Sequence, residues 1–472
     1  MHITTFTSQE LEKIHEASLK VLAKTGVIFH STKILEMFRK SSARVENDKV
    51  FITPGMVEKA LNTAPESFTW QARNKDQTVT IGTGKLAIQP NIGPVYVHDL
   101  ENGRRKSTFA DFINMQKLAQ SSDIVNLVGS LPLEPNDLDQ NTKHLQMMHA
   151  VLKYTDKPII GLAAHEKTIA QTLGMMELAI QPCTSRSLKE DHWIGVAINP
   201  LSPLTYSPDA LETILGYAMQ NQPIFIGPAI MAGVTGPIHP LGTIILQNAE
   251  ILAGIVLTQL INPGNPVVYV CASTAAYMKN ASFVTGTPEM SLIHAGGIQL
   301  GKEYYNFPTR SLCGMSDAKT IDYQAGLESM CGALVSILSK TDMMVESLGC
   351  LESFMATSYE KFILDEEIIS RALVLKKGIN ASDADIDTSL DLIMDVGHGQ
   401  YLTHPSTLKN FRDRWTPSVS NWDIHDTWAS DMNRDIIVKA NKKVKERLSS
   451  LENPLIFGEE DARLKKFMEN SI

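Results

Sequence analysis

Hydrophobic and polar positions follow two different rhythms along this chain. Between residues 7 and 23, apolar residues recur at helical spacing, and Thr7 with Glu10 has the pattern of a capping box, so we expect an amphipathic helix there. Up to about residue 85, a second helical stretch and two strand-like pieces, 68–72 and 79–81, predict a cap segment outside the main core.

After residue 86 the rhythm changes to short apolar runs rich in β-branched residues, each followed by a longer helical stretch. This pattern is typical of βα units and a parallel sheet. The runs span residues 87–97, 124–131, 158–164, 193–198, 224–230, 267–271, 308–313 and 343–348. Eight such units close a barrel, so we predict an α/β fold, the (β/α)8 TIM barrel. The rival architecture is a doubly wound open sheet, but no strand is followed by a Gly-x-Gly-x-x-Gly turn.

The chain beyond Leu364 is polar and helical, with a basic-faced amphipathic helix at 431–450 and a charged tail at 449–472. We therefore divide the chain into a cap segment (1–85), the barrel core (86–364) and a C-terminal helical extension (365–472). The extension is expected to wrap the barrel or to join subunits.

Composition excludes several classes of function. The net charge of −9 and the dispersed lysines and arginines give no basic stripe for a nucleic-acid backbone. The five cysteines are odd in number and form no Cys-x-x-Cys pair, which argues against a disulfide framework and a structural zinc site. The N-terminus lacks the order of a signal peptide, and no run reaches the length of a membrane span, so we expect a cytoplasmic protein.

Polar residues at the carboxyl ends of barrel strands are the candidates for chemistry, because active sites of such barrels form there. Each is also compatible with a purely structural role, as a polar side chain that is hydrogen-bonded inside the barrel. They are Gln89, Asn91, Tyr96 and His98 in the first unit, Asn199 after the fourth strand, Arg310, Cys313, Ser316 and Asp317 around the seventh, and Glu346 and Phe354 in or after the eighth.

Several reactions common on this scaffold are disfavoured. No apolar run contains a lysine for a Schiff base, and Glu346 is the only acid well inside a strand, which argues against an enolase-type metal site. Histidines and cysteines are scattered, so no metal site is predicted. His398 and His404 follow the barrel and are candidates either for covering its mouth or for capping helices.

Segments along nearly the whole chain together resemble the trimethylamine methyltransferase family. The strongest is Ser316-Asp317-Ala318-Lys319 followed by Asp322 and Gln324-Ala325-Gly326. The others are Gly26-Val27, Ala72-Arg73-Asn74, Ser202-Pro203-Leu204, Asn248-Ala249-Glu250, Leu364-Asp365-Glu366-Glu367-Ile368 and His398 to His404.

This resemblance implies a barrel that presents its substrate to cobalt(I) of a corrinoid on a separate protein docked over the barrel mouth, with no cofactor bound tightly by the chain itself. Family members that act on trimethylamine carry pyrrolysine, whereas this sequence has ordinary residues throughout. The branch without pyrrolysine is associated with quaternary amines such as glycine betaine, proline betaine and carnitine. A quaternary ammonium already leaves as a neutral amine, so it needs no special electrophile. Family resemblance and the terminal helices also suggest a homo-oligomer.

The charge of such a substrate suggests roles for the candidate residues. Nitrogen loses its positive charge as cobalt attacks, so weak aromatic and carboxylate contacts suit the ammonium end, and a planar cation suits a substrate carboxylate. We assign Tyr96, Phe354 and Glu346 to the ammonium, Arg310 to the carboxylate, and Gln89, Asn91 and Asn199 as neutral donors. No side chain is required as an acid, a base or a nucleophile.

Two alternatives stay open at this point. One is an unrelated barrel lyase or hydrolase that uses Glu346 or Asp317 as its base. The other is a betaine-binding protein without catalysis.

Overall fold

Eight parallel strands form a curled sheet at the centre of the molecule. The computed structural model describes residues 1–129, 131–432, 435–451 and 453–471. In sheet order the strands are β6 (Ala87–Ile88), β19 (Met343–Val345), β18 (Thr309–Leu312), β15 (Val267–Cys271), β13 (Ile224–Ile226), β11 (Ile194–Ile198), β10 (Ile159–Ile160) and β9 (Val128–Gly129). The N–H groups of Asn126 and Leu127 donate to the Ile88 carbonyl, so the two ends of the sheet meet. The predicted barrel is confirmed.

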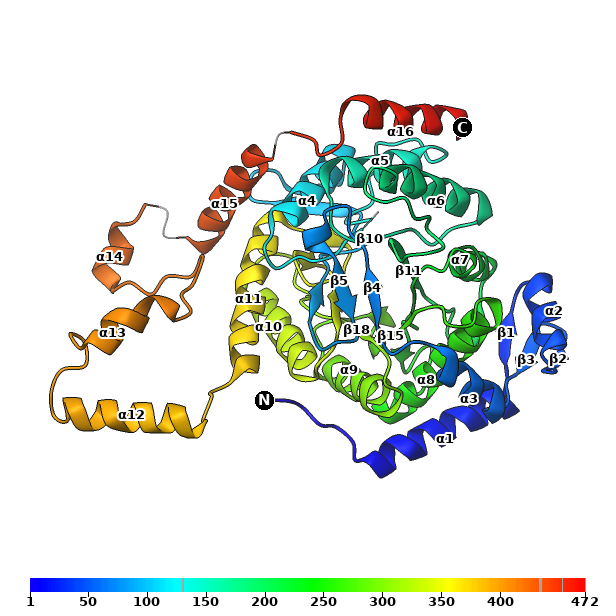
Figure 1. Ribbon diagram of the computed structural model, residues 1–472, viewed down its shortest axis with the longest axis horizontal. Coiled ribbons are helices and arrows are strands. Elements are labelled where there is room, and N and C mark those ends of the chain that lie inside the picture. The colour runs from blue at the N-terminus through cyan, green and yellow to red at the C-terminus, as the bar shows by residue number, and fades with distance from the viewer. Residues whose placement is uncertain (130, 433–434, 452, 472) are drawn as a thin grey trace.

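A helix follows each strand and covers the outside of the ring (Figure 1). These helices are α4 (Phe109–Ser121), α5 (Lys143–Tyr154), α6 (Glu166–Ile180), α7 (Pro208–Met219), α8 (Pro240–Ile261), α9 (Pro288–Gln299), α10 (Tyr323–Leu338) and α11 (Tyr359–Lys377). Their starts match local sequence signals: Ser207 caps α7 ahead of Pro208, and the Asp322 side chain accepts the N–H of Ala325 at the start of α10.

α8 requires a correction to the sequence analysis. It is the one helix in the described part of the chain that is long and apolar enough to cross a membrane by length and composition. Within its apolar window, 83% of the residues are buried inside the protein, which is the setting of a core helix.

The N-terminal segment contributes one small layer beside the barrel and one hairpin inside its end. α1 (Ser8–Lys24) carries the predicted capping box at Thr7, and α2 (Thr32–Lys40) and α3 (Pro54–Thr63) follow it. β1 (Val27–Phe29), β2 (Arg44–Glu46) and β3 (Lys49–Phe51) form a sheet with β12 (Thr205–Tyr206).

The hairpin of β4 (Phe68–Trp70) and β5 (Val79–Ile81) lies across the amino-terminal end of the barrel (Figure 1). Phe68, Trp70 and Ile81 are buried among the inward-facing side chains of the barrel strands. Both strand-like pieces of the sequence analysis are therefore strands. The predicted cap lay outside the main core, whereas this part of it fills one end of the barrel.

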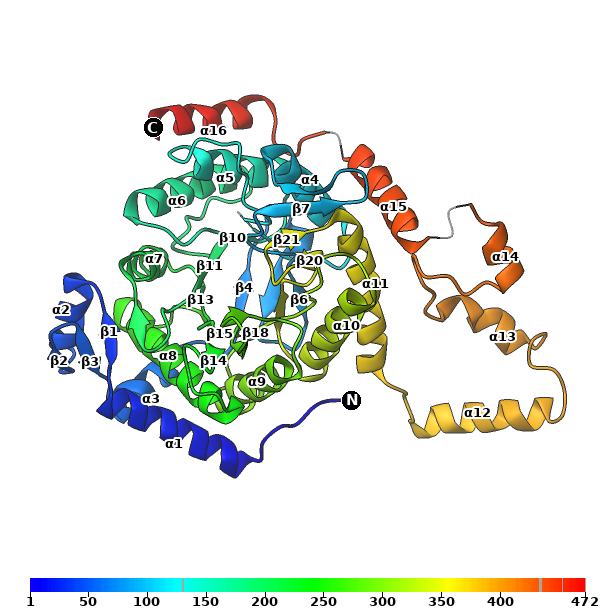
Figure 2. The same ribbon diagram turned by 180° about the vertical axis from the view of Figure 1, so that it is seen from behind.

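Two accessory sheets surround the carboxyl end, which faces the viewer in Figure 2. One has the order β20 (Cys350–Leu351), β21 (Ala356–Thr357), β7 (Tyr96–Asp99), β8 (Gly103–Lys106). The other has the order β14 (Met231–Ala232), β16 (Thr274–Tyr277), β17 (Ser282–Phe283). The first predicted run, 87–97, is thus split between β6 and β7 in different sheets. Pro90 and Pro94 lie at the break, and proline cannot continue a ladder of strand hydrogen bonds.

The C-terminal extension begins within α11 and continues as α12 (Asp383–Val396), α13 (Pro405–Asn410), α14 (His425–Ser430), α15 (Ile436–Ser450) and α16 (Gly458–Ser471). α15 confirms the predicted basic helix, and residues 433–434 of that prediction lie outside the described residues. α15 and α16 pack on the barrel, whereas residues 378–414, here called the arm, project from it (Figures 1 and 2).

Glu367 on α11 fastens the chain where it returns from the arm. One carboxylate oxygen accepts the N–H groups of Ser418, Val419 and Ser420, and the other accepts a bond from Arg371. Burial alone would raise the pKa of Glu367, but the bonds from Ser420, Arg371 and Val419 outweigh it and lower the pKa to about 2.

We expect this fastening to weaken in acid. An unfolded glutamate has a pKa of about 4.3, so the contribution of Glu367 is complete above that value and is lost as pH falls towards 2. Amide hydrogen exchange at residues 418–420, corrected for its intrinsic pH dependence, should therefore lose protection over this window. Glu367→Gln should show the weaker protection at neutral pH as well; equal protection in both proteins would contradict this role.

Candidate active site at the carboxyl end of the barrel

Arg310 and Gln89 lie inside the barrel above an aromatic floor. Alternation along β18 turns Arg310 inward, and its Nη2 donates to Gln89 Oε1 at 2.9 Å. The guanidinium carbon lies 5.5 Å from the centroid of the Phe225 ring, which in turn lies 5.4 Å from the Trp70 ring of the end hairpin. The hairpin therefore supports the floor on which Arg310 rests.

The side chain of Glu346 points toward this group because the backbone conformation changes at the end of β19. Met344 faces the surrounding helices, so regular alternation would turn Glu346 outward as well. Its φ of 56° is in the left-handed region, which is costly for a residue with a side chain. The buried carboxylate accepts the N–H of Ile92 at 3.0 Å.

Burial controls the charges of these two groups. Desolvation raises the pKa of Glu346 to about 8, against the opposing effects of the Ile92 N–H and of Arg310. Desolvation also lowers the pKa of Arg310 to about 10, which leaves it charged at neutral pH. At pH 7 the pair thus carries a positive charge at Arg310 and a mostly neutral carboxyl at Glu346.

Asn91 supplies unused hydrogen-bonding capacity beside this pair. Its side chain is only 2% exposed, yet neither its amide nitrogen nor its amide oxygen has a hydrogen-bond partner among the residues that the structure describes. Nε of Arg310 is likewise buried without a partner. Buried polar atoms are normally satisfied, so these atoms indicate a place for a polar ligand. We call Gln89, Asn91, Arg310 and Glu346 the buried polar cluster.

Phe354 and Asn199 lie at the rim. Phe354 packs against the cluster of Met290, Met315 and Cys350, and its ring meets the Phe283 ring edge-on at 5.3 Å between centroids. Asn199 follows β11 directly and is exposed to solvent. Both are therefore placed to contact a ligand that enters from the carboxyl end.

The loop that carries Phe354 is strained. Glu352, Ser353 and Phe354 have φ values of 55°, 55° and 63°, a run of left-handed residues without a glycine. Such a conformation persists only where surrounding contacts impose it, and it often occurs at functional sites.

Asp317 provides the contacts that hold this loop. Its carboxylate accepts the N–H groups of Thr285 and Gly286 at 2.9–3.0 Å, the Thr285 hydroxyl at 3.0 Å and the Ser353 hydroxyl. The segment 316–319 thereby connects the loop after β17 to the β20–β21 hairpin. With its oxygens occupied by these donors, Asp317 is poorly suited to act as a base.

We expect Asp317→Asn to loosen the rim, because an amide cannot accept all of these hydrogen bonds. The melting temperature should fall by a few degrees, which corresponds to a loss of about 1–2 kcal/mol in the free energy of unfolding. Ligand binding should also change the fluorescence of a probe attached at position 354 by less than it does in the unaltered protein. Ser353→Ala, which removes one donor only, should have a smaller effect. An unchanged melting temperature in Asp317→Asn would contradict the bracing role.

Tyr96 is not brought together with the buried polar cluster. It packs with Ala318, Leu351 and Ala356, and the Arg104 guanidinium covers its ring at 3.6 Å while binding both carboxylate oxygens of Glu352. The sequence analysis did not single out Arg104, Glu352, Phe283 or the floor residues Trp70 and Phe225.

Three of the other candidates, Ser316, Cys313 and His404, have structural partners in the described chain. Ser316 donates to Glu328, Cys313 lies 3.3 Å from the Ser347 hydroxyl, and burial raises the pKa of the Cys313 thiol to about 12. His404 caps α13 on the arm, away from the barrel mouth.

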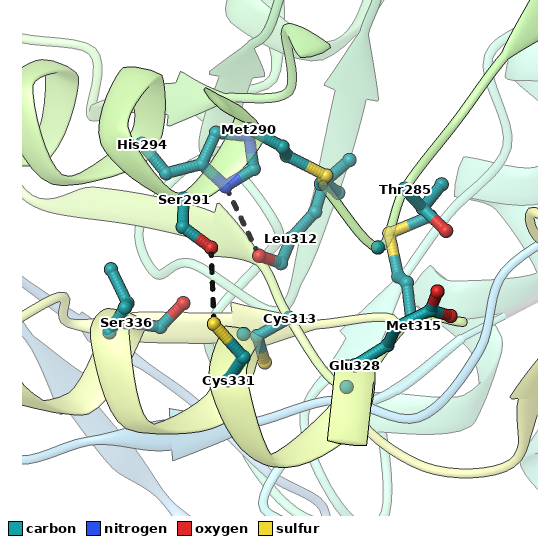
Figure 3. A pocket seen from close by; sticks show the side chains of 14 residues that line it. Thr285, Met290, Ser291, His294, Leu312, Cys313, Met315, Glu328, Cys331 and Ser336 are labelled. Atoms are coloured by element: carbon teal, nitrogen blue, oxygen red, sulfur yellow. Dashed lines mark hydrogen bonds between the residues drawn. The ribbon is translucent and has the colours of Figure 1, made fainter. Parts of the chain in front are cut away.

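A separate pocket lies between α9 and α10, outside the ring of strands (Figure 3). Met290, His294, Leu312 and Cys331 are among its lining residues, and Nδ1 of His294 lies 3.2 Å from the Leu312 carbonyl oxygen. It contains none of the seven residues assigned to substrate in the sequence analysis. The unmet hydrogen bonds of Asn91 and of Arg310 Nε lie instead at the buried polar cluster.

The fold and the buried polar cluster define a barrel protein with a candidate ligand site at the carboxyl ends of its strands. The family model for trimethylamine methyltransferase (MTTB) matches residues 1–471, so the chain belongs to this family.

Similar proteins include the glycine betaine methyltransferase of Desulfitobacterium hafniense, 36% identical over 98% of this chain and 96% of the relative. The proline betaine:corrinoid methyltransferase of Eubacterium limosum is 33% identical over 95% of this chain and 93% of the relative. A trimethylamine methyltransferase of D. hafniense is 27% identical, over 95% and 89% of the two chains.

Among solved structures, the Methanosarcina barkeri monomethylamine methyltransferase has a similar fold. Its TM-score is 0.51 at 11% identity, over 95% of this chain and 92% of that one. The relatives and the fold both agree with the resemblance noted in the sequence.

Proposed function

We propose that this protein is a corrinoid-dependent methyltransferase that demethylates a small quaternary amine of the betaine class. The observation that carries the proposal is the buried polar cluster: a charged arginine, a titratable glutamate and an asparagine with unmet hydrogen bonds at the carboxyl end of the barrel. A betaine has a carboxylate and a quaternary ammonium a short distance apart, which matches one cation and one acid. The named betaine relatives support the same substrate class.

In this mechanism, cobalt(I) of a corrinoid on a partner protein is the second substrate. Its electron pair forms the bond to the methyl carbon while the carbon–nitrogen bond breaks, and nitrogen keeps that bonding pair as a neutral tertiary amine. The positive charge on nitrogen disappears, so no proton transfer to the leaving group is needed. The chain's own contribution is to orient the substrate and exclude water.

Each residue of the site has a defined task in this proposal. Arg310 binds the substrate carboxylate, with Asn91 and Gln89 as neutral partners and Asn199 at the entrance. Glu346, once ionised, and Phe354 lie at the ammonium end. Tyr96 is left out because Arg104 already covers its ring. The remaining expectations, a cytoplasmic location, a homo-oligomer and a corrinoid protein docked at the carboxyl end, belong to the same proposal.

The test is to mix the purified protein, reduced cob(I)alamin and a panel of betaines, and to follow methylcobalamin in the visible spectrum. The panel is then repeated with the cognate corrinoid protein. We expect methylation with one betaine and not with trimethylamine. Saturable binding without methyl transfer, even with the corrinoid partner, would instead identify a binding protein. Turnover without any methyl acceptor would indicate a different reaction.

A further inference from the structure

An ion pair is buried next to the carboxyl ends of β18 and β19. Lys361 and Asp365 lie one turn apart on α11 and are 2% and 1% exposed. The Lys361 ammonium lies 2.9 and 2.8 Å from the two carboxylate oxygens of Asp365. The loss of hydration in a buried pair largely offsets the attraction of its charges, so stability alone is a weak explanation for it. Its other hydrogen bonds indicate a different role.

Both members of the pair hydrogen-bond to the turns that follow the two strands. Lys361 Nζ donates to the Gly314 carbonyl oxygen at 3.1 Å and to the Ser329 hydroxyl at 2.7 Å. The Ser329 hydroxyl donates in turn to the same carbonyl at 2.9 Å. Asp365 Oδ2 accepts the N–H of Gly349 at 2.8 Å. Gly314 lies just beyond β18 and Gly349 just beyond β19, so one ion pair joins the ends of the two strands.

The two turns also touch each other. Gly314 has a φ of 70°, and a Cβ atom there would lie 2.4 Å from the Ser347 carbonyl oxygen, so the close approach requires glycine. The Cys313 sulfur lies 3.3 Å from the Ser347 hydroxyl. The bonds that fix Gly314 therefore also limit where the turn of residues 346–349 can lie.

Glu346 depends on this turn more than Arg310 does. Arg310 lies within β18, which pairs with β15 on one side and with β19 on the other. Glu346 follows the last residue of β19, has left-handed backbone, and donates its N–H to the Pro90 carbonyl oxygen at 3.2 Å. The turn of residues 346–349 thus sets the inward direction of Glu346, and the bond from Gly349 to Asp365 fixes its far end.

We propose that Lys361 and Asp365 are positioning residues for the ammonium end of the site. They hold the turns after β18 and β19 so that the Glu346 carboxyl group stays inside the barrel. They act through the backbone, since their hydrogen bonds go to each other, to Ser329 and to the two turns. The inference rests on the proposed function, because it takes Glu346 as a contact of the substrate ammonium.

Lys361→Met with Asp365→Leu tests this role without leaving a buried charge unpaired. Replacing a buried ion pair by apolar side chains is often neutral for stability, so the melting temperature should change by less than about 5 °C. With the corrinoid partner, kcat/KM should fall at least about tenfold, chiefly through KM. The fall should be similar for the betaine and for tetramethylammonium, a quaternary ammonium without a carboxylate, because it arises at the ammonium end.

A milder variant covers the case in which the first does not fold. In Lys361→Met with Asp365→Asn, the amide oxygen can still accept the N–H of Gly349, whereas the bond to Gly314 is lost. Its kcat/KM should lie between those of the unaltered protein and of Lys361→Met with Asp365→Leu. A loss as large as that of the leucine variant would contradict the part assigned to the Gly349 bond.

The pH profile gives a readout that a purely structural role would not change. Burial raises the pKa of Glu346 to about 8, and a loosened turn admits water to the carboxyl group and lowers that pKa. The rise of kcat/KM with pH should therefore begin at least about one pH unit lower in Lys361→Met with Asp365→Leu. Arg310, Cys313 and Cys350 also interact with Glu346 electrostatically, but their pKa values of about 10 and above keep them out of this range.

A second ion pair on the same two strands provides the matched control. At their amino ends, the Lys302 ammonium lies 2.6 Å from Asp342, which also accepts the N–H of Thr309 at 3.0 Å. Lys302→Met with Asp342→Leu removes bonds of the same kinds at the end of the strands far from the site. It should leave the pH profile and KM for both substrates unchanged, whatever its effect on the melting temperature.

Two measurements without methyl transfer separate this inference from the proposed function. Amide hydrogen exchange at residues 346–354 should be faster in Lys361→Met with Asp365→Leu than in the unaltered protein and the control. Calorimetric binding of tetramethylammonium should weaken and shift its pH dependence in the same variant. A protein that transfers no methyl group would overturn the proposed function and leave these two measurements to decide the positioning role. Unchanged exchange, or faster exchange with unchanged affinity and pH dependence, would overturn that role.

Discussion

Arg310→Ala is expected to lower kcat/KM for the preferred betaine by at least about 100-fold, chiefly through KM. Removing one partner of a buried charge-assisted pair costs about 2–5 kcal/mol, and each factor of ten corresponds to about 1.4 kcal/mol. For tetramethylammonium, which has no carboxylate, the fall should stay within about fivefold. Steady-state rates with both substrates and the corrinoid partner measure the difference.

Two further variants guard this experiment against a general loss of structure. Arg310→Lys keeps the charge but not the planar fork, so it should fall between the unaltered protein and Arg310→Ala. Arg186→Ala removes an exposed arginine and should leave kcat/KM unchanged for both substrates. If Arg310→Ala lowers kcat/KM equally for the betaine and for tetramethylammonium, Arg310 does not bind the substrate carboxylate.

The second large effect is expected from Glu346. Its pKa of about 8 leaves most molecules protonated at pH 7, whereas a quaternary ammonium favours the ionised carboxylate. kcat/KM should therefore rise with pH through about 8, because the deprotonated form binds the cation. It should fall again as Arg310 loses its proton near pH 10.

Glu346→Gln should abolish the rising limb of this profile and lower kcat/KM at high pH by about tenfold or more. Glutamine keeps an acceptor for the Ile92 N–H, so the fold should persist. Direct binding of tetramethylammonium by calorimetry separates the effect from any titration of the corrinoid partner. Glu58→Gln, an exposed site, is the control. A rising limb that survives in Glu346→Gln would assign it to another group.

The barrel could be predicted from sequence because each strand is a short β-branched run followed by a helical stretch. All eight runs contain the strand expected of them. The strand within residues 87–97 is shorter than the predicted run, because Pro90 and Pro94 end β6 and the chain then enters another sheet. That break also explains Tyr96, since a residue beyond it no longer shares the inward face of β6. The division at residues 85 and 364 stays a prediction.

The site was predictable in composition but not in arrangement. Gln89 and Arg310 follow from alternation along a strand, which is a local property. The inward direction of Glu346 and the position of Phe354 depend on residues with a left-handed backbone conformation. None of these residues is a glycine or an asparagine, the residue types that would predict such a conformation from sequence. Similarly, the sequence predicted a polar, helical extension after Leu364, but it did not predict that apolar residues of α12 such as Leu390 and Ile393 lie exposed outside the fold.

The hairpin at the amino-terminal end of the barrel has a consequence for kinetics. Trp70 is completely buried there, so the hairpin closes this end of the barrel and a ligand of the proposed site would enter and leave through the carboxyl end. In the proposed function, a methyl acceptor docked at the carboxyl end would keep the amine inside the barrel until the acceptor dissociates. On that proposal we expect ordered binding, with the amine first and the acceptor second, and release of the demethylated amine last. The released amine should then compete with the substrate for the free enzyme, and saturation with the acceptor should not relieve that inhibition.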